Sequence, residues 1–348
     1  MKSKLINSLI GVSSLMFLMT ACSSNSSSTT TSAIKSTGPI KMDFGQYCGS
    51  QCQDALKLNV SPDSIKGKVG MAIASTTFPY GVAIKNESEA FAKKYFPNMQ
   101  LLVADGQNDP SVQSGIVDDF IAKGINVLII NAVEKAALAP AVKRAEAAGI
   151  KVIEVDRTVN APVLTTIKAN DIDLGIAAGK DLATRLHGKG NVVEIQGSPS
   201  ASPTIDRHKG FMEALKDYPG IKVIASQNAD YDQSKGLSVM EDLLQRFPKG
   251  KIDAVFSQAD IMTLGAIQAI KNAGRNEIKV ISIDGQQAAF NDISNGTIDS
   301  TTVYPVIAPM DIIAAAKALA GEKLPSFIKL DSPTVTKENV SKYNGTTY

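Results

Sequence analysis

Five polar side chains suited to binding a hydroxylated molecule stand at the ends of short apolar runs in this sequence. They are Ser75, Asn131, Asp156, Arg157 and Asp284. Carboxylates accept hydrogen bonds from hydroxyl groups and guanidinium groups donate them, and each such bond contributes roughly 1.5–3 kcal/mol net. Four or five of these bonds, with an aromatic ring stacked on a sugar face, are enough for micromolar affinity. The pattern therefore predicts a site for a polyhydroxylated ligand.

The same residue types permit two other interpretations. Asp and Asn after a strand often cap the next helix. Asp156 and Asp284 could instead act as the carboxylate pair of a glycoside hydrolase, in which carboxyl spacing sets the stereochemistry. We favour ligand binding over hydrolysis because Arg157 and Arg207 are expected to keep both acids ionised, whereas a general acid must hold a proton.

Short β-branched runs alternate with amphipathic segments from Lys68 onward. The predicted strands are Val69–Ala74, Gln100–Ala104, Val127–Asn131, Val152–Val155, Val192–Ile195, Lys222–Ala225, Ala254–Phe256 and Lys279–Ile283. The predicted helices include Ala83–Tyr95, Val112–Ala122, Ala136–Ala148, Leu174–Leu186 and Gly236–Phe247. Strand and helix in alternation predict parallel sheets with helices on both faces, an α/β fold.

The alternation breaks between Asp156 and Asp171, where Val163–Ala169 is expected to form an extended crossover rather than a helix. Eight uninterrupted units could close into a single barrel, but a break in mid-pattern favours two sheets. Open parallel sheets bind ligands at the carboxyl ends of their strands. We therefore expect the strand ends of two sheets to face a shared cleft.

The composition is that of an ordinary globular chain of about two domains. The chain has 348 residues, of which 44% are hydrophobic and 20% charged, and this excludes collagen-like, disordered and polytopic membrane proteins. Lys and Arg total 36 against 34 for Asp and Glu, and no basic cluster stands out, so nucleic acid is not an expected partner. No G-x-S-x-G, Walker A or G-x-G-x-x-G motif occurs.

Residues 1–21 read as a secretory signal that ends in a lipobox-like sequence. The stretch has no acidic residue and carries an apolar run, and Leu18-Met19-Thr20-Ala21 precedes Cys22. We expect Cys22 to be lipidated, with an ordinary signal peptide as the alternative. Ser23–Thr31 is almost all Ser and Thr, a composition typical of a flexible tether. The sequence thus predicts an extracytoplasmic protein, in the periplasm or at the cell surface, held to a membrane by a lipid anchor.

Cys48 and Cys52 are the other two cysteines of the chain. Outside the reducing cytosol a disulfide between them is permitted, and it would close a very small loop and pin the extension from about Asp43 to Leu58. A metal-binding pair is the alternative. The two histidines, His187 and His208, are far away in sequence, and no clustered ligand set appears, so we expect no metal site.

From about Lys66 to Leu330 the sequence resembles the ribose-type periplasmic sugar-binding proteins of ABC importers, in particular the ribose- and galactofuranose-binding branch. The resemblance rests on segments that occur in the family's order and spacing. They are VADGQN at 103–108, LIIN at 128–131, VDR at 155–157, VEIQG at 193–197, IDRHKGF at 205–211, QAD at 258–260 and SIDG at 282–285. It implies the type I fold, two Rossmann-like lobes joined by a three-crossover hinge that closes on ligand.

The resemblance implies sugar contacts from both lobes. In the N-lobe these are Ser75, Tyr80, Asn131, Asp156 and Arg157, and in the C-lobe Arg207, Tyr231 and Asp284. The chain has no Trp, so its tyrosines and Phe78 are the available stacking faces. Tyr304 occupies the family's position on the last crossover strand and completes the expected site.

Three positions depart from the family pattern. Ala259 replaces an asparagine, so a sugar hydroxyl at that place would lose its partner. Gly81 replaces a stacking phenylalanine, and the first loop is one residue shorter, which brings Phe78 near a polar position. Tyr304 replaces a glutamine and adds bulk from the hinge side. A site built around one sugar rejects analogues that leave its polar groups unpaired. We therefore expect a sugar or related polyol that need not be ribose.

The lobe boundaries follow from the same resemblance. After a tether and extension at residues 22–65, the N-lobe covers residues 66–169 and about 305–324, including a helix near Ala308–Ala320. The C-lobe covers residues 170–304, and a C-terminal segment covers residues 325–348.

The expected function is capture of the sugar by hinge closure and its delivery to an ABC permease and its ATPase, without a cofactor and with the protein acting as a monomer. A sensor that acts with a chemoreceptor or kinase is the first alternative, and a glycoside hydrolase is the second. A repressor of the same fold is excluded because its helix-turn-helix would stand where this chain has a signal.

Overall fold

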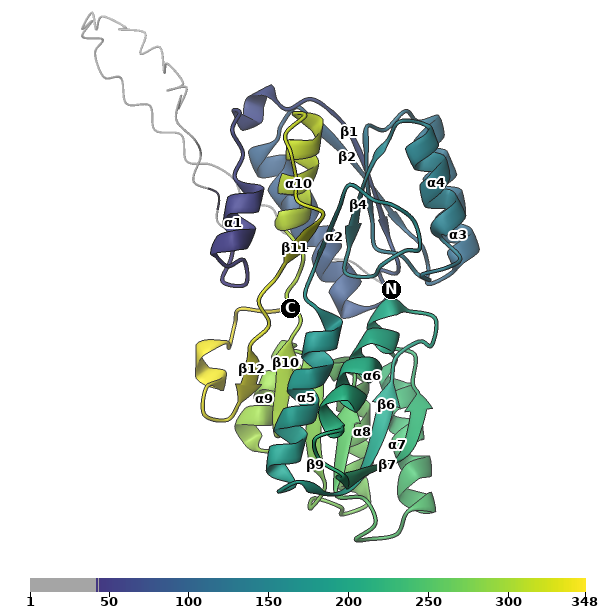
Figure 1. Ribbon diagram of the computed structural model, residues 1–348, viewed down its shortest axis with the longest axis vertical. Helices are drawn as coiled ribbons and strands as arrows, with labels where there is room; N and C mark the ends of the chain where they lie inside the picture. The colour runs from purple at the N-terminus through teal and green to yellow at the C-terminus, as the bar shows by residue number, and fades with distance from the viewer. Residues whose placement is uncertain (1–41, 43) are drawn as a thin grey trace, which may run out of the picture. The chain divides into compact units, whose positions relative to one another are not determined.

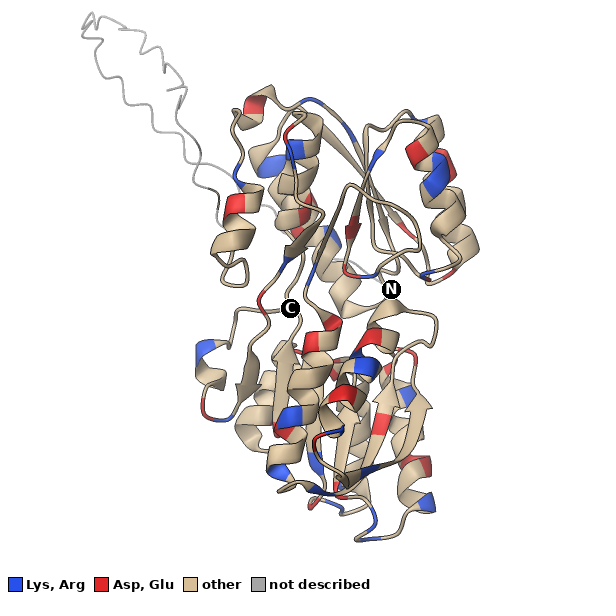
Figure 2. Cartoon of the chain, in the orientation of Figure 1, with Lys and Arg blue, Asp and Glu red and all other residues tan. Residues whose placement is uncertain are grey.

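The structure is a computed structural model that describes residues 42 and 44–348 (Figure 1). The predicted signal, Cys22 and the Ser/Thr-rich tether lie outside the described residues. Within the described part of the chain, no helix combines the length and the apolar character that crossing a bilayer requires. Lys and Arg residues are interspersed with Asp and Glu along the described helices, in keeping with the nearly neutral composition (Figure 2).

The first sheet has six strands, all paired in parallel. Their order is β11 (Phe327–Lys329), β5 (Thr165–Lys168), β4 (Lys151–Val155), β3 (Val127–Ile130), β1 (Gly67–Ile73) and β2 (Met99–Asp105). The flanking helices are α2 (Pro79–Tyr95), α3 (Pro110–Ala122), α4 (Ala139–Ala147) and α10 (Met310–Leu319). Figure 1 shows α3 and α4 on one side of this sheet and α2 and α10 on the other. The apolar run of β3 is fully buried, as a strand covered on both faces requires.

The second sheet also has six strands, with one antiparallel strand at its edge. Their order is β12 (Thr334–Thr336), β10 (Ser300–Val303), β9 (Lys279–Asp284), β8 (Ala254–Ser257), β6 (Lys189–Gln196) and β7 (Gly220–Asn228). The helices packed with it are α5 (Asp171–Arg185), α6 (Ser202–Leu215), α7 (Gln233–Arg246), α8 (Asp260–Asn272) and α9 (Gln287–Asn295). The two-sheet α/β prediction is confirmed, and all eight predicted strands are present.

The chain passes between the two sheets after β5, after β10 and after β11. The extended crossover predicted at Val163–Ala169 contains β5, which joins the first sheet before the chain enters α5. Asn170 begins that helix by accepting a hydrogen bond from the Ile172 backbone N–H at 3.1 Å. Residues 325–348 supply a strand to each sheet, because β11 pairs with β5 and β12 pairs with β10. These crossing segments bring the carboxyl ends of both sheets together.

The N-terminal extension packs on the core of the first sheet. A short helix, α1 (Ser50–Leu56), contacts α10 and β11, and Cys48, Cys52 and Leu56 are buried there. A disulfide joins Cys48 to Cys52. Downstream, Asn59 donates two hydrogen bonds of 2.9 Å to the Glu322 carboxylate. The extension therefore belongs to the folded body from about residue 47 onward.

Candidate ligand-binding site

One cavity in the described structure is lined by residues that follow the strands of both sheets. All ten predicted site residues line it. They are Ser75, Phe78, Tyr80, Asn131, Asp156, Arg157, Arg207, Tyr231, Asp284 and Tyr304. The sequence analysis did not predict the other lining residues as site residues, and they are Ala74, Pro79, Gly81, Pro203, Ile261 and Gln286. The structure thus brings together, from positions as distant as 75 and 304, the side chains that the sequence singled out.

Asn131 positions Asp156 on the first-sheet side of the cavity. Its side-chain oxygen accepts a hydrogen bond from the Ala74 backbone N–H at 3.1 Å, and its side-chain nitrogen donates to the Asp156 carboxylate at 2.7 Å. Asp156 has a φ of 57°, in the left-handed region that non-glycine residues seldom occupy. Burial raises the pKa of Asp156 although Arg157 opposes the shift. Asn131 therefore acts on Asp156 as well as facing the cavity.

Arg157 combines a cation–π contact with unused donors. Its guanidinium carbon lies 5.3 Å from the centroid of the Tyr231 ring, and one of its nitrogens donates to the Val133 carbonyl at 3.3 Å. Among the described residues no other side chain or carbonyl accepts a hydrogen bond from this guanidinium. Arg157 is only 7% exposed and lines the cavity, so bulk water reaches its guanidinium poorly. Its remaining N–H groups are therefore available to a ligand in the cavity.

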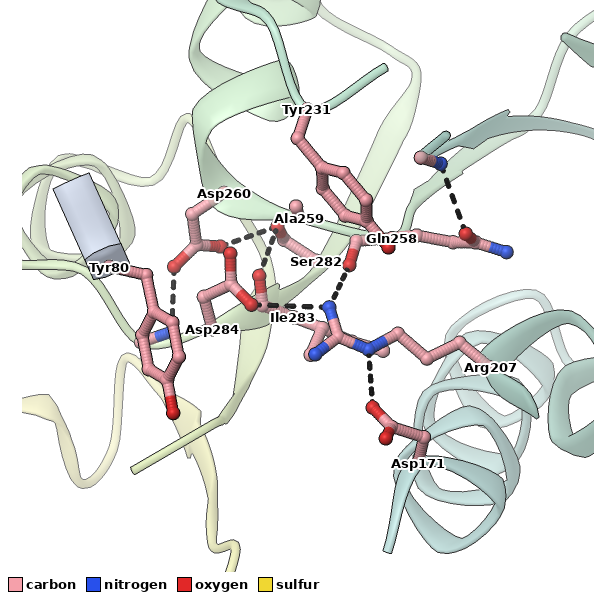
Figure 3. A network of polar contacts seen from close by, with 12 residues as sticks. Tyr80, Asp171, Arg207, Tyr231, Gln258, Ala259, Asp260, Ser282, Ile283 and Asp284 are labelled. Carbon is pink, nitrogen blue, oxygen red and sulfur yellow. Dashed lines mark hydrogen bonds and ion pairs between the residues drawn. The ribbon is translucent and has the colours of Figure 1, made fainter. Parts of the chain in front are cut away.

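Arg207 is the most heavily engaged cation of the site (Figure 3). It lies in α6 and donates to the Asp171 carboxylate at 2.8 Å, to the Gln258 carbonyl at 2.6 Å and to the Asp284 carboxylate at 3.2 Å. Burial alone would lower the pKa of Arg207, but the carboxylates of Asp171 and Asp284 raise it well above its ordinary value. The guanidinium is therefore fixed and charged, between the helix layer and the end of β9.

Asp260 organises the loop that carries Asp284 (Figure 3). One of its carboxylate oxygens accepts the backbone N–H groups of Gly285 and Gln286 at 2.7 and 2.8 Å. The other accepts the hydroxyls of Ser282 at 2.5 Å and Thr301 at 2.9 Å. Asp284, the last residue of β9, has a φ of 129° that this network holds in place. The sequence analysis did not name Asp260 as a site residue, although it ends the QAD segment at 258–260.

The pKa of Asp284 differs from what the sequence analysis predicted. Burial raises its pKa to about 8 even though the Arg207 guanidinium opposes the shift. For Asp284 this contradicts the expectation that Arg157 and Arg207 keep both acids ionised, and for Asp156 the pKa is raised in the same direction. Both carboxyl groups are buried in the cavity wall. The loss of hydration raises their pKa values by more than the neighbouring positive charge lowers them.

Aromatic rings cover the cavity from two sides. Phe78 meets Tyr231 edge to face with ring centroids 6.5 Å apart, and Tyr80 meets Tyr304 edge to face at 5.4 Å. The Tyr80 hydroxyl donates to the Pro305 carbonyl at 3.0 Å, and the Tyr231 and Thr204 hydroxyls are hydrogen-bonded at 2.8 Å. The Tyr304 hydroxyl is buried and has no partner among the described residues. Leaving a buried hydroxyl without a hydrogen bond costs free energy, and a ligand hydroxyl in the cavity would supply the missing partner.

Charged groups of both signs, unpaired donors and aromatic faces in one enclosed site suit a small hydroxylated molecule, and comparison with known proteins agrees. Residues 69–323 match the periplasmic binding protein domain. The chain belongs to this family. Membership places it outside the cytoplasm, among binding proteins rather than enzymes.

Two curated members of the family are about one-third identical to this chain. The ribose import binding protein RbsB of Bacillus subtilis is 34% identical over 263 residues, covering 75% of this chain and 84% of that protein. The galactofuranose-binding protein YtfQ of Escherichia coli is 34% identical over 284 residues, covering 79% and 89%. The predicted resemblance to the ribose and galactofuranose branch is thus confirmed.

A solved structure of the family has the same fold. It is an ABC transporter solute binding protein from Mycobacterium smegmatis with bound glycerol, which superposes with a TM-score of 0.76 at 33% sequence identity. The superposition covers 80% of this chain and 97% of that one. The type I fold predicted from the sequence is confirmed by this likeness.

Two departures from the family pattern have structural explanations. A β-carbon at Gly81 would lie 1.8 Å from the Ser75 carbonyl oxygen, so α2 approaches the first loop too closely for any side chain there. Ala259 is 2% exposed, precedes α8 and packs in the core of the second sheet. It is not among the residues that line the cavity, whereas Ile261 is. At the start of α8 it is therefore the apolar side chain of Ile261, and not position 259, that contributes to the cavity wall.

Proposed function

We propose that this protein is the substrate-binding subunit of an ABC importer that captures a monosaccharide or related polyol between its two lobes and delivers it to a membrane permease and its ATPase. The observation that supports this most directly is a cavity that holds all ten predicted site residues and to which both sheets contribute. Arg157 and Asp156 come from one side, and Arg207 and Asp284 come from the other. A ligand that bonds to both sides stabilises the closed form over the open one.

The balance of charges in the cavity favours a neutral ligand. Both arginines and the carboxyl groups of Asp156 and Asp284 line the cavity. Arg207 donates to the Asp284 carboxylate at 3.2 Å, so the wall offers donors and acceptors together rather than one sign of charge. A phosphorylated or carboxylated sugar would need an excess of cations, whereas alternating donors and acceptors suit vicinal hydroxyls. The proposed ligand class is therefore an uncharged sugar or polyol.

Three residues set the expected selectivity within that class. Tyr304 fills space from the crossover side and presents a buried hydroxyl without a partner. Ile261 adds an apolar side chain to the wall, and Phe78 adds an aromatic ring that meets Tyr231 edge to face. A sugar that lacks a hydroxyl opposite Ile261 and has one within reach of Tyr304 fits best, because buried polar groups left unpaired reduce affinity. We propose that this ligand need not be ribose.

A thermal-shift screen of the purified protein against pentoses, hexoses, furanose sugars and polyols tests the proposal. A ligand at a hundred times its dissociation constant stabilises the fold by about 2.7 kcal/mol, which raises the melting temperature by a few degrees. We expect at least one sugar to produce this shift and Asp284→Ala to abolish it. Asp119→Ala, which alters an exposed ion pair on α3, is the matched control and should respond like the wild type. Absence of any shift across the panel contradicts the proposed ligand class.

Membrane attachment through a lipid on Cys22 is also part of the proposal. It rests on the lipobox-like sequence before Cys22 and on the Ser/Thr-rich stretch that follows. Labelled palmitate should be incorporated into the wild-type chain in a bacterial host and not into Cys22→Ser, which is expected in the soluble extracytoplasmic fraction. Equal labelling of the two proteins would argue against the anchor.

We propose a monomer, since one chain supplies both walls of the cavity.

A further inference from the structure

The segment after β12 folds back along α9 and ends beside the cavity. Gln287 in α9 holds it through three hydrogen bonds. Its backbone N–H donates to the Tyr348 carbonyl at 3.1 Å, its side-chain oxygen accepts from the Gly345 N–H at 2.7 Å, and its side-chain nitrogen donates to Asn344 at 3.3 Å. These bonds tie residues 344–348 to a helix of the second sheet.

A second contact anchors the same segment. The Tyr343 ring lies against Phe290 of α9 with centroids 6.4 Å apart, and Phe290 is fully buried in the core of the second sheet. The segment is therefore attached to the second lobe at two successive places before it reaches Tyr348. We call residues 343–348 the C-terminal arm.

The Tyr348 ring crosses to the first lobe. It meets the ring of Tyr80 edge to face at 5.5 Å between centroids, and Tyr80 belongs to α2, which flanks the first sheet. On another side Tyr80 meets Tyr304 at 5.4 Å, so the Tyr80 ring, which lines the cavity, is held between two other rings. The arm thus links α9 to α2 across the ligand site.

The Tyr348 hydroxyl supports a role in the site. It is buried, and it interacts with the side chain of Gln286, a residue that lines the cavity. Burial raises the pKa of Tyr348 well above its ordinary value, and the negative charge of Asp284 adds to the shift. The rings of Tyr304 and Tyr348 therefore both stand next to Tyr80, at the edge of the cavity.

We propose that Tyr348 is a positioning residue that latches the closed form and determines how tightly and for how long the sugar is held. The proposal rests on the function proposed above. Tyr348 acts through Tyr80, because it is the Tyr80 ring and not its own that lines the cavity. A contact made only when the lobes are closed slows opening, so it acts on the dissociation rate more than on the association rate.

The experiment measures sugar dissociation by stopped flow and affinity by calorimetry on the purified protein. For Tyr348→Ala we expect dissociation to become about 3- to 10-fold faster, the range set by the loss of one aromatic pair, with little change in the association rate. Tyr348→Phe keeps the ring and should stay near the wild-type rate if the ring alone acts. A rate that rises in both variants instead assigns the effect to the hydroxyl. Lys342→Ala, exposed just before the arm, is the matched control and should have no effect.

An unchanged dissociation rate in Tyr348→Ala overturns the latch while leaving the importer proposal intact. If the wild type binds no sugar, the importer proposal fails instead. The latch is then judged from inter-lobe distances between spin labels on the ligand-free protein. We expect longer and broader distances in Tyr348→Ala than in Lys342→Ala, and identical distributions would overturn it.

Discussion

Arg207→Ala is expected to abolish sugar binding and to destabilise the fold. The change removes three hydrogen bonds, of which two are to carboxylates, and a guanidinium whose carbon lies 5.0 Å from the Tyr304 ring centroid. Removing one partner of a buried ion pair costs about 3–5 kcal/mol. We expect the lower end for folding, because Asp171 keeps Lys168 at 2.6 Å. Sugar affinity should fall by at least about 100-fold, since a buried charged contact is lost from the wall.

Graded variants separate the binding effect from the folding effect. Arg207→Lys keeps the charge near Asp171 but lacks the planar fork that reaches Gln258 and Asp284 together, so it should fold and still bind sugar weakly. Arg246→Ala, on the exposed face of α7, is the matched control. Urea unfolding gives the stability and calorimetry gives the affinity. Tight sugar binding by a folded Arg207→Ala protein would refute the assignment of Arg207 to the site.

Asp260→Ala is expected to have the second-largest effect, although Asp260 does not line the cavity. The change leaves the backbone N–H of Gln286 without an acceptor inside the core, and it leaves that of Gly285 only the Thr301 hydroxyl at 3.3 Å. The hydroxyls of Ser282 and Thr301 lose the same partner. Each buried donor left unpaired costs roughly 1–3 kcal/mol, so we expect a loss of about 3–5 kcal/mol in the free energy of unfolding. Sugar affinity should also fall, because Asp284 precedes these groups and loses the contacts that hold its strained backbone.

Asp260→Asn provides the matched control. Its amide oxygen can accept the two backbone N–H groups, and its amide nitrogen can donate to the hydroxyls of Ser282 and Thr301, so most of the stability should return. A loss as large as that of Asp260→Ala would show that charge, and not hydrogen bonding, is what the loop needs. Urea unfolding at several pH values makes the comparison.

The pH dependence of the free energy of unfolding gives an independent check on the role of Asp260. Burial raises the pKa of Asp260 to about 6, above the value of about 3.8 expected in the unfolded chain. The stability that this group contributes is therefore fully present below about pH 4 and is lost as the pH rises through about 6. Asp260→Asn has no such group, so its stability should vary less than that of the wild type between these values.

The polar residues of the site could be predicted because they follow strands. The carboxyl ends of parallel strands meet at one edge of a sheet, so Asn131, Asp156 and Asp284 had to lie near the cleft once the strands were assigned. Buried parallel strands also have a clear signature in continuous β-branched runs such as Val127–Ile130. Family spacing supplied Arg207, Tyr231 and Tyr304, which no strand pattern indicates.

Three short strands gave no comparable signal. β10 reads Ser-Thr-Thr-Val, and β11 and β12 have three residues each, too few to show a period. The buried threonines of β10 are stable there because Thr301 bonds to Asp260 from the neighbouring layer. Such pairing is a tertiary contact, and the isolated sequence does not reveal it.

The α/β alternation, the two sheets and the strand-end polar residues of the cavity were thus legible in the sequence, because strand period and strand-end chemistry are local properties. The family resemblance supplied the other predicted site residues. Only the tertiary structure decided that Asp260 positions Asp284, that Ile261 rather than Ala259 faces the ligand site, and that Tyr348 reaches Tyr80. It also decided the raised pKa of Asp284. These features depend on which groups are buried against one another across long stretches of chain, and burial is set by packing rather than by neighbours in sequence.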